Sequence, residues 1–298
     1  MLKPLLAVDA PSLLYRAFYA LPDSIKGSDG RPVNALLGAT NLILLEAERH
    51  DPRAIVLCFG AEAATYRKEL LPAYHADRPE MPADLVPQWE AAGAFFGSFG
   101  WLVTEHETLE ADDLLGSYAR LESEAGGRAL LLTGDRDMFQ CASDRVTVLY
   151  VSTGVRGAPE VGPAEVHERY GVEPAQVPDF IALRGDPSDG IPGAKGVGEK
   201  TAAELLRTHG SLEGALRHHT CDRLGHRAQV GDQVAGVYRQ RVALASGRFA
   251  MIDNGLGFEL VPWKPALDQH LGRHVNGVVQ PGGAIDWSLG RKRGLGLG

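Results

Sequence analysis

Eight carboxylates stand at positions where folding could bring them together. They are Asp9, Glu110, Asp112, Asp113, Asp135, Asp137, Asp186 and Asp189. Six of them come just after short apolar runs typical of buried strands, and the other two lie in the turn-like segment Gly-Asp-Pro-Ser-Asp. Any one of them could cap a helix or lie in a solvated turn, but eight carboxylates that converge without cations would repel one another. The set therefore predicts bound metal ions.

The ligand type indicates which metal and which chemistry to expect. All eight candidates offer oxygen, and no supporting histidine or cysteine accompanies them. Oxygen-only ligand sets favour Mg²⁺ or Mn²⁺ over Zn²⁺. Two such ions about 4 Å apart are the usual arrangement for phosphodiester hydrolysis, with a metal-bound water as the nucleophile. The sequence thus predicts two or more divalent ions and a hydrolytic reaction.

Alternating strand and helix patterns would place these carboxylates at one edge of a sheet. The predicted strands are Leu5–Val8, Ala54–Phe59, Trp101–Thr104 and Ala129–Thr133, and the predicted helices are Asn34–His50, Asp84–Gly97 and Glu110–Ala125. Apolar strands that alternate with helices are typical of a parallel sheet covered on both faces, with its sites beyond the carboxyl ends of the strands. Positions three apart on a helix share a face, so Glu110 and Asp113 should point together and Asp112 about 100° away.

The second half of the chain has mostly helical patterns. The predicted helices are Ala164–Tyr170, Pro178–Arg184, Glu199–Thr208, Leu212–His218 and Val230–Ala245. The last ten residues are rich in glycine, which raises the entropy cost of ordering, so we expect a disordered tail.

The composition is that of an ordinary globular protein, with 298 residues, 44 % hydrophobic and 23 % charged. No apolar run approaches the roughly 18 residues of a membrane span, and three scattered cysteines indicate neither a disulfide framework nor a zinc site. We expect a cytoplasmic monomer without a membrane partner. The net charge of −8 argues at first against a polyanionic partner, but the eight candidate metal ligands account for all of that excess.

Three motifs, in order, make the chain similar to a known family. Glu110-Ala-Asp-Asp113, Thr133-Gly-Asp-Arg-Asp137 and the glycine-rich run from Gly185 to Ala202 resemble the bacterial 5′→3′ exonuclease/flap endonuclease family. That family includes the N-terminal nuclease domain of DNA polymerase I, and the likeness runs from about Leu5 to Leu216. The resemblance implies an α/β, PIN-like fold of the flap-endonuclease type. Such a fold has a central, mostly parallel sheet flanked by helices, a helical arch and a helix–three-turn–helix element that grips duplex DNA.

Applied to this chain, the resemblance implies three regions. They are a nuclease core in residues 1–175 with its arch at about 60–88, a helical DNA-binding subdomain in 176–250 and an extension in 251–298.

The family pattern also implies a role for each carboxylate. Asp9, Glu110 and Asp112 would hold one metal, and Asp135, Asp137 and Asp189 a second, with Asp113 and Asp186 in support. The residues implied to contact DNA are Arg16, Tyr74, Gly193, Lys195, Gly196, Gly198, Lys200 and Thr201. The glycines would let backbone N–H groups approach a phosphate closely. The same turn is implied to bind K⁺.

Two positions depart from the family pattern. Gly60 stands where the family has an aspartate after the second strand, so one carboxylate of the first metal is missing. Glu62 is a candidate replacement, and Gly60→Asp should raise Mg²⁺-supported activity. In the arch, Tyr74-His75 replaces a Tyr-Lys pair.

Three basic residues of the arch, Arg67, His75 and Arg78, are implied to be catalytic and to face the scissile phosphate, while Tyr74 would stack on a displaced base. The ordinary pKa of histidine is about 6.5 against about 10.4 for lysine, so His75 would be largely neutral near physiological pH.

Three functions remain open on the sequence. The first is a structure-specific nuclease acting on 5′ flaps and 5′ ends of duplex DNA in replication or repair, with a DNA polymerase or ligase in trans. The second is a ribonuclease of the related small metal-dependent fold, against which the glycine-spaced turn at 193–201 argues. The third is a DNA junction-binding protein whose catalysis weakened or was lost with Gly60 and His75. The intact carboxylates favour the first.

Overall fold

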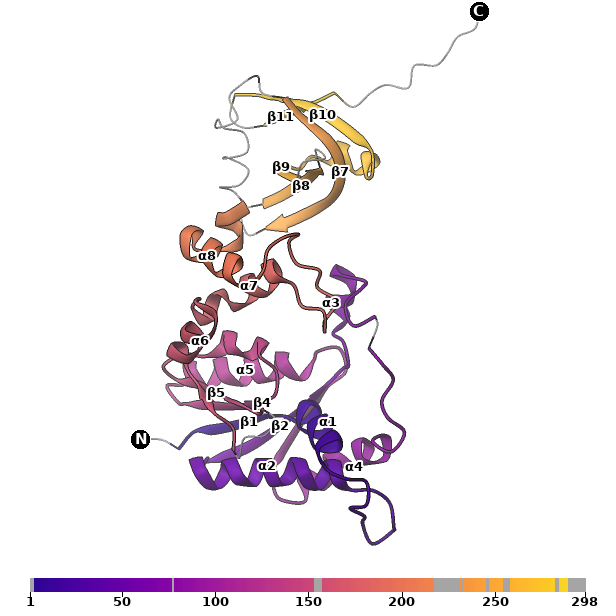
Figure 1. Ribbon diagram of the computed structural model, residues 1–298, viewed down its shortest axis with the longest axis vertical. Helices are drawn as coiled ribbons and strands as arrows, with labels where there is room; N and C mark the ends of the chain where they lie inside the picture. Colours follow the sequence, from indigo (N-terminus) through magenta and orange to yellow (C-terminus); the bar gives the residue numbers. More distant parts are fainter. Residues whose placement is uncertain are drawn as a thin grey trace, which may run out of the picture. The chain divides into compact units, whose positions relative to one another are not determined.

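A computed structural model describes residues 3–76, 78–152, 157–216, 231, 233–244, 247–253, 258–281 and 284–288. The chain divides into two units, Met1–Arg207 and Thr208–Gly298 (Figure 1). Among the described residues, no helix combines the length and the apolar character needed to cross a membrane.

The first unit is built on a six-stranded sheet in the order β3-β2-β1-β4-β5-β6. Its strands are β1 (Leu5–Asp9), β2 (Ala54–Gly60), β3 (Leu102–His106), β4 (Ala129–Thr133), β5 (Val146–Tyr150) and β6 (Glu160–Val161). All neighbours are parallel except β6, which runs antiparallel to β5. Every residue of β1 and β4 is buried, as the continuous apolar runs predicted. The mostly parallel sheet is therefore confirmed.

Helices cover both faces of this sheet, and α2 and α5 lie on opposite faces in Figure 1. The helices are α1 (Ala10–Ala20), α2 (Asn34–His50), α3 (Thr65–Leu70), α4 (Val86–Gly97), α5 (Ala111–Glu124), α6 (Pro163–Tyr170), α7 (Val177–Arg184) and α8 (Glu199–His209), with short 3₁₀ turns η1 (Asp137–Cys141) and η2 (Pro174–Gln176). The core between α1, α2 and the sheet includes Leu13, Leu14, Ile43 and Leu57, all fully buried. In the described part of the arch region 60–88, the short α3 is followed by turns, and α4 begins at Val86.

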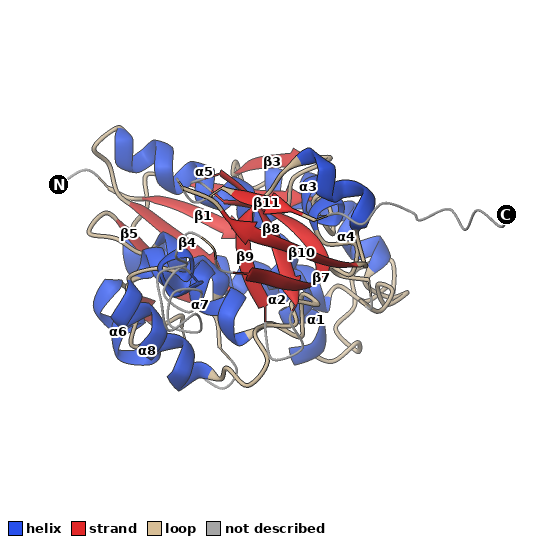
Figure 2. Cartoon of the chain, turned by 90° about the horizontal axis from the view of Figure 1, so that it is seen from above, coloured by secondary structure: helices blue, strands red, loops and turns tan. Residues whose placement is uncertain are grey.

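The second unit contains a five-stranded antiparallel sheet in the order β11-β10-β7-β8-β9. The strands are β7 (Gln233–Leu244), β8 (Gly247–Asp253), β9 (Phe258–Pro262), β10 (His274–Val279) and β11 (Ile285–Trp287), with the 3₁₀ turn η3 at Pro265–His270. Figure 2, coloured by secondary structure, draws these five as strands. Tyr238, Ala250, Ile252 and Leu267 form the centre of a separate core.

The helix predicted over Val230–Ala245 is wrong, because β7 occupies most of that range. Val234, Gly236 and Tyr238 are buried while Gln233, Ala235 and Arg239 are exposed, which is the two-residue period of a strand. The boundary predicted at residue 250 also falls inside β8, so the region 176–250 is not helical throughout. Residues 212–216 are helical as predicted. The rest of that predicted helix and the predicted tail lie outside the described residues.

Candidate active site

The carboxyl ends of β1 and β4 hold the first pair of predicted ligands together. Asp9 is the last residue of β1 and caps α1, where its Oδ1 accepts a hydrogen bond from the Ser12 N–H at 3.1 Å. Its Oδ2 accepts from the hydroxyl of Thr133, the last residue of β4, at 2.7 Å. Because β1 and β4 are parallel neighbours, both residues reach the same edge of the sheet. Asp9 and Thr133 are buried there.

The turn after β4 sets the position of the next two ligands. The Asp135 N–H donates to Thr133 Oγ1, and the Asp137 N–H donates to Asp135 Oδ1, each at 2.9 Å. Aspartate commonly holds the backbone two residues on in this way. The Thr-Gly-Asp-Arg-Asp spacing therefore builds its own turn and keeps two carboxylates beside the Asp9 end of the sheet.

Asp112 is the residue whose surroundings point most directly to a cation. Its Oδ1 is shielded from solvent and has no hydrogen-bond partner among the described residues. Burial and the negative charges of Asp9 and Asp135 hold the pKa of Asp112 well above its usual range. A buried oxygen without a partner is costly, and a divalent cation would satisfy it.

The pKa values of the neighbouring carboxylates are raised as well. Burial raises the pKa of Asp9 to about 6, and the nearby Asp135 adds to the rise. Burial, with the charges of Asp135 and Asp189, raises the pKa of Asp137 to about 7. Burial also raises the pKa of Asp135. Four carboxylates thus lie close enough to oppose one another's ionisation, and a bound cation would reduce that repulsion.

Two pockets meet at Asp135. A pocket of about 1230 Å³ is lined by Asp9, Glu110, Asp112 and Asp135, and one of about 290 Å³ is lined by Asp135, Asp137 and Asp186. Within the described ranges, no three His, Cys, Asp or Glu side chains gather tightly enough to hold a metal ion as they stand. The donor chemistry fits Mg²⁺ or Mn²⁺, but the oxygens surround open pockets and do not form a closed coordination shell.

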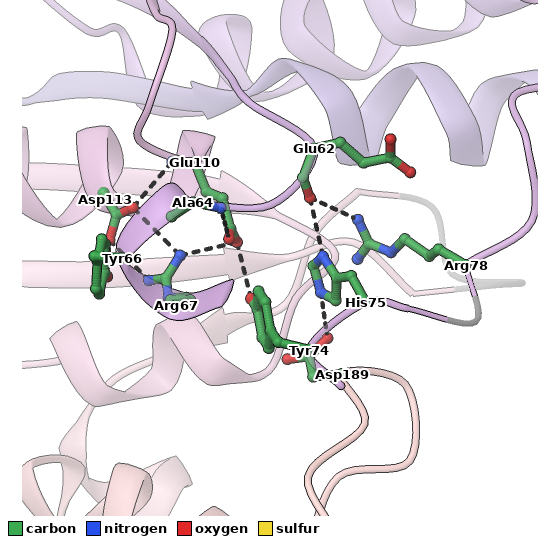
Figure 3. A network of polar contacts seen from close by, with 10 residues as sticks. All are labelled: Glu62, Ala64, Tyr66, Arg67, Tyr74, His75, Arg78, Glu110, Asp113 and Asp189. Atoms are coloured by element: carbon green, nitrogen blue, oxygen red, sulfur yellow. Dashed lines mark hydrogen bonds and ion pairs between the residues drawn. The ribbon is translucent and has the colours of Figure 1, made fainter. Parts of the chain in front are cut away.

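Glu110 and Asp113 are engaged by the arch (Figure 3). One Glu110 oxygen accepts from the Ala64 N–H at 2.6 Å, and the other lies 2.9 Å from the Arg67 guanidinium. Asp113 lies 2.7 Å from the same guanidinium and caps α5 by accepting from the Glu110 N–H at 3.0 Å. Both carboxylates contact Arg67, so they share a face as their spacing predicted. Arg67 is thereby held between two carboxylates.

Tyr74 and His75 are also held by the protein. The Tyr74 hydroxyl donates to Glu110 at 3.0 Å, and its ring stacks on that of His75 with centroids 4.0 Å apart. The nitrogens of His75 lie 2.9 Å from the Glu62 carbonyl oxygen and 2.9 Å from Asp189 Oδ1 (Figure 3). The His75 side chain is only 4 % exposed, so here it ties the arch to the Asp189 turn.

Gly60 lies where no side chain can be accommodated without movement. A Cβ at this position would come within 2.4 Å of the Leu109 carbonyl oxygen and 2.6 Å of the Ala111 nitrogen. The Ala61 N–H donates to that same Leu109 carbonyl at 2.8 Å. The loop entering α5 thus closes over the end of β2. The Gly60→Asp variant would therefore have to displace this loop before its carboxylate could reach a metal ion, a requirement that the sequence did not indicate. Glu62 lines the larger pocket.

The residues predicted to contact DNA lie in two places. Arg16 lines the larger pocket and donates to the Gly134 carbonyl at 2.6 Å, and Arg78 lines the same pocket. Tyr74, also predicted to contact DNA, lies in the arch against Glu110. The remaining residues of that set surround the turn before α8, where Gly193 and Gly196 have positive φ values of 67° and 81°. Lys195, Gly196, Gly198, Lys200 and Thr201 are exposed around this turn.

Arg184 is a residue that the sequence reasoning missed. Its guanidinium lies 3.4 Å from Asp186 and 3.2 Å from Glu199, the first residue of α8, and stacks over Phe180. Arg184 therefore links the turn that holds Asp186 to the start of α8, which follows the glycine-rich turn at 193–198. Its only signal in the sequence was its position directly before the Gly-Asp motif.

Comparison with known proteins identifies the class to which this fold and site belong. The model described as "5'-3' exonuclease, N-terminal resolvase-like domain" matches residues 4–171. A 5'-3' exonuclease of Mycobacterium tuberculosis is 37 % identical, over 72 % of this chain and 73 % of the relative, and one of Streptomyces coelicolor is 39 % identical, over 70 % and 72 %. The chain therefore belongs to the 5'-3' exonuclease family.

Further matches concern longer relatives, the fold and the second unit. DNA polymerase I of Mycobacterium leprae is 42 % identical over 72 % of this chain, which spans 24 % of that relative. The solved structure of T5 5'-exonuclease with bound zinc ions superposes with a TM-score of 0.61 at 20 % identity, covering 74 % of this chain and 80 % of that one, which supports the fold. Residues 201–296 match a different model, described as a protein of unknown function (DUF3363).

Proposed function

We propose that this chain is a structure-specific DNA nuclease that hydrolyses phosphodiesters at 5′ flaps and 5′ ends of duplex DNA with divalent metal ions. The observation that carries the proposal is Asp112, whose buried oxygen has no hydrogen-bond partner among the described residues and faces the negative charges of Asp9 and Asp135. The names of its relatives, 5'-3' exonuclease and DNA polymerase I, support the substrate class and the reaction.

The donor sets of the two pockets support at least two Mg²⁺ or Mn²⁺ ions. Asp9, Asp112 and Asp135 would hold an ion in the larger pocket, and Asp135, Asp137 and Asp186 one in the smaller. A bound divalent ion would supply a water of lowered pKa and offset the charge that develops on the phosphate. Glu110 and Asp189 would join only by giving up contacts to Arg67, Tyr74 or His75.

The chain's own residues would orient the ligands and the DNA. Thr133 fixes the Asp9 carboxylate, and the turn after β4 fixes Asp135. Arg16 and Arg78 line the larger pocket and would bind phosphate oxygens. Arg67 and His75, which contact carboxylates, are positioning residues in this scheme, and they keep Glu110 and Asp189 in place.

Lys195, Lys200 and Thr201 would contact the duplex beyond the cut, because the exposed glycine turn lets backbone N–H groups approach a phosphate. We also assign K⁺ to this turn. Because cleavage of a flap leaves a nick or gap, a DNA polymerase or ligase would follow in trans. The protein would act as a cytoplasmic monomer.

One experiment separates catalysis from binding alone. A labelled 5′-flap duplex is incubated with the protein in Mg²⁺ and then in Mn²⁺, beside the variants Asp135→Ala and Asp144→Ala. Asp144 is an exposed residue on the same unit, so its variant controls for the loss of one negative charge. Asp135→Ala should lose at least about a hundredfold in cleavage rate and Asp144→Ala almost nothing. Tight flap binding by the parent without cleavage in either metal would instead establish a junction-binding protein.

A further inference from the structure

The second unit differs from the rest of the chain in charge. Residues 208–298 contain eleven Lys and Arg against seven Asp and Glu, a net charge of +4, whereas the other 207 residues carry −12. The unit lies beyond the residues that match the exonuclease family. A basic unit attached to an acidic one favours a polyanionic partner.

The described part of this unit holds two arginines against one indole ring. The guanidinium carbon of Arg241, on β7, lies 5.1 Å from the centre of the Trp263 ring, and that of Arg248, on β8, lies 5.5 Å from it. The Trp263 N–H of the backbone donates to the Arg248 carbonyl at 3.0 Å, which fixes the ring beside β8. Its indole N–H donates to Asp268 at 3.0 Å. The ring thus holds two cations at defined positions.

Two other cations of this unit, Arg239 and Lys264, are already engaged by protein oxygens. Arg239 is neutralised by Asp253, with nitrogen–oxygen distances of 3.0 and 2.9 Å, and Lys264 donates to the Ile285 carbonyl at 2.8 Å. Arg241 has Asp268 only at 3.9 Å, and Arg248 makes no ion pair within the described part of the chain. Both arginines are exposed.

We propose that the cluster Arg241, Trp263 and Arg248 binds the phosphodiester backbone of DNA, as a second contact surface separate from the metal site. Stacking on an indole orders both guanidinium groups in advance, so less side-chain freedom is lost on binding. Guanidinium forks match phosphate oxygens geometrically. Among the described residues, the nearest ion-pair partner of the two arginines is Asp268, 3.9 Å from Arg241, so an anion placed between the guanidinium groups would reduce their mutual repulsion. The choice of DNA among polyanions rests on the proposed function.

The test measures DNA binding by the full-length protein in EDTA, so that no metal is needed and no cleavage occurs. The probes are a fluorescent blunt DNA duplex and an RNA duplex of the same sequence. The variants are Arg241→Gln, Arg248→Gln and the double change. Arg239→Gln is the matched control, because it removes the same charge from the same strand as Arg241 but from a side chain already bound to Asp253.

The double variant should bind DNA about tenfold more weakly, with a salt dependence reduced by about two released ions, and Arg239→Gln should stay within about twofold of the parent. An equal loss in Arg239→Gln, no loss in any variant, or a loss confined to RNA would overturn the inference. If thermal unfolding shows that the double variant is destabilised, the DNA affinity of the single variant Arg248→Gln tests the inference instead. Arg248 has no ion pair to break among the described residues.

The outcome is independent of the nuclease proposal. Flap cleavage by the double variant at saturating DNA should match the parent, because neither arginine lies in the first unit. A protein that cleaves flaps yet loses no binding in the double variant overturns only this inference. A protein that loses binding as expected but never cleaves overturns only the proposed function.

Discussion

The eight predicted carboxylates form two groups that differ in their partners. Among the described residues, Asp9, Asp112, Asp135 and Asp137 form no ion pair, and burial raises their pKa values. Glu110, Asp113 and Asp189 contact Arg67 or His75 from the arch, and Asp186 contacts Arg184 of α7. The first group is poised to accept a metal ion, whereas the second is already stabilised by the protein. Proximity at a sheet edge is therefore insufficient to identify a metal ligand, because neighbouring cations decide which oxygens stay available.

The largest expected effect comes from Asp112→Asn, which tests the first group. The amide removes a buried charge that no protein group compensates, so the metal-free variant should unfold about 2–4 °C higher than the parent. The same change should lower metal-dependent cleavage at least about a hundredfold. Thermal unfolding in EDTA and flap cleavage in Mg²⁺ measure the two effects. Asp144→Asn, on the surface, should change neither. A destabilised Asp112→Asn in EDTA would contradict the contrast between the groups.

Arg67→Ala tests the second group and should act in the opposite direction on stability. It leaves Glu110 and Asp113 without their shared cation, so the free energy of unfolding should fall by about 1–3 kcal/mol. Cleavage should fall about tenfold, because Glu110 and the start of α5 lose a positioning contact. Arg53→Ala is the control, since the Arg53–Glu122 pair lies far along the sheet and should contribute less than about 1 kcal/mol. Rescue of cleavage by Arg67→Lys would show that charge alone suffices.

The next test uses Gly60. It distinguishes the effect of adding a carboxylate at this position from the effect of adding a side chain where there is no room for one. Both Gly60→Ala and Gly60→Asp introduce a Cβ within 2.4–2.6 Å of the backbone at 109–111. Each should therefore lower the free energy of unfolding by about 1–3 kcal/mol, measured by denaturant titration. Each should also lower Mg²⁺-supported cleavage a few-fold through displacement of α5. Higher activity in Gly60→Asp than in the parent, with Gly60→Ala impaired, would show that the loop yields and that the carboxylate is used.

The sequence predicted which carboxylates reach the sheet edge, but it did not predict which side chains contact them there. Apolar runs followed by aspartates identified β1 and β4 and brought Asp9 and Asp135 to one sheet edge, because parallel strands have that geometry. The partners of Glu110 could not be predicted, because Arg67 and Tyr74 lie some 40 residues away and reach it only through the tertiary fold. The closure of the loop at 109–111 over Gly60 leaves no trace in residue type.

The second unit shows a different limit of prediction. The segment 230–245 mixes alanine, glutamine and arginine with valine, so its composition suits a helix nearly as well as a strand. Pairing of β7 with both β8 and β10 decided the outcome, and no local pattern specifies those partners. The family resemblance also implied a helical DNA-binding subdomain up to residue 250, whereas residues 201–296 match another family model.

The smallest expected effect concerns pH and again separates the two groups. In metal-free protein, Asp137 has a folded-state pKa of about 7, above the ordinary 3.8, so the folded state holds a proton there that the unfolded state releases. Its contribution to stability is therefore present at about pH 4 and is lost as the pH rises through 7.

Asp137→Asn should flatten part of the decrease in unfolding temperature between about pH 5 and pH 8 in EDTA, by a few degrees. Asp113→Asn should not flatten it, because Arg67 already stabilises the Asp113 carboxylate and its loss should instead lower stability across the range. Saturating Mg²⁺ should raise the unfolding temperature of the parent more at pH 8 than at pH 5, since ligands must lose their protons to bind a cation. An equal effect of both variants on the pH profile would remove the distinction between the carboxylates held by the arch and those left for metal.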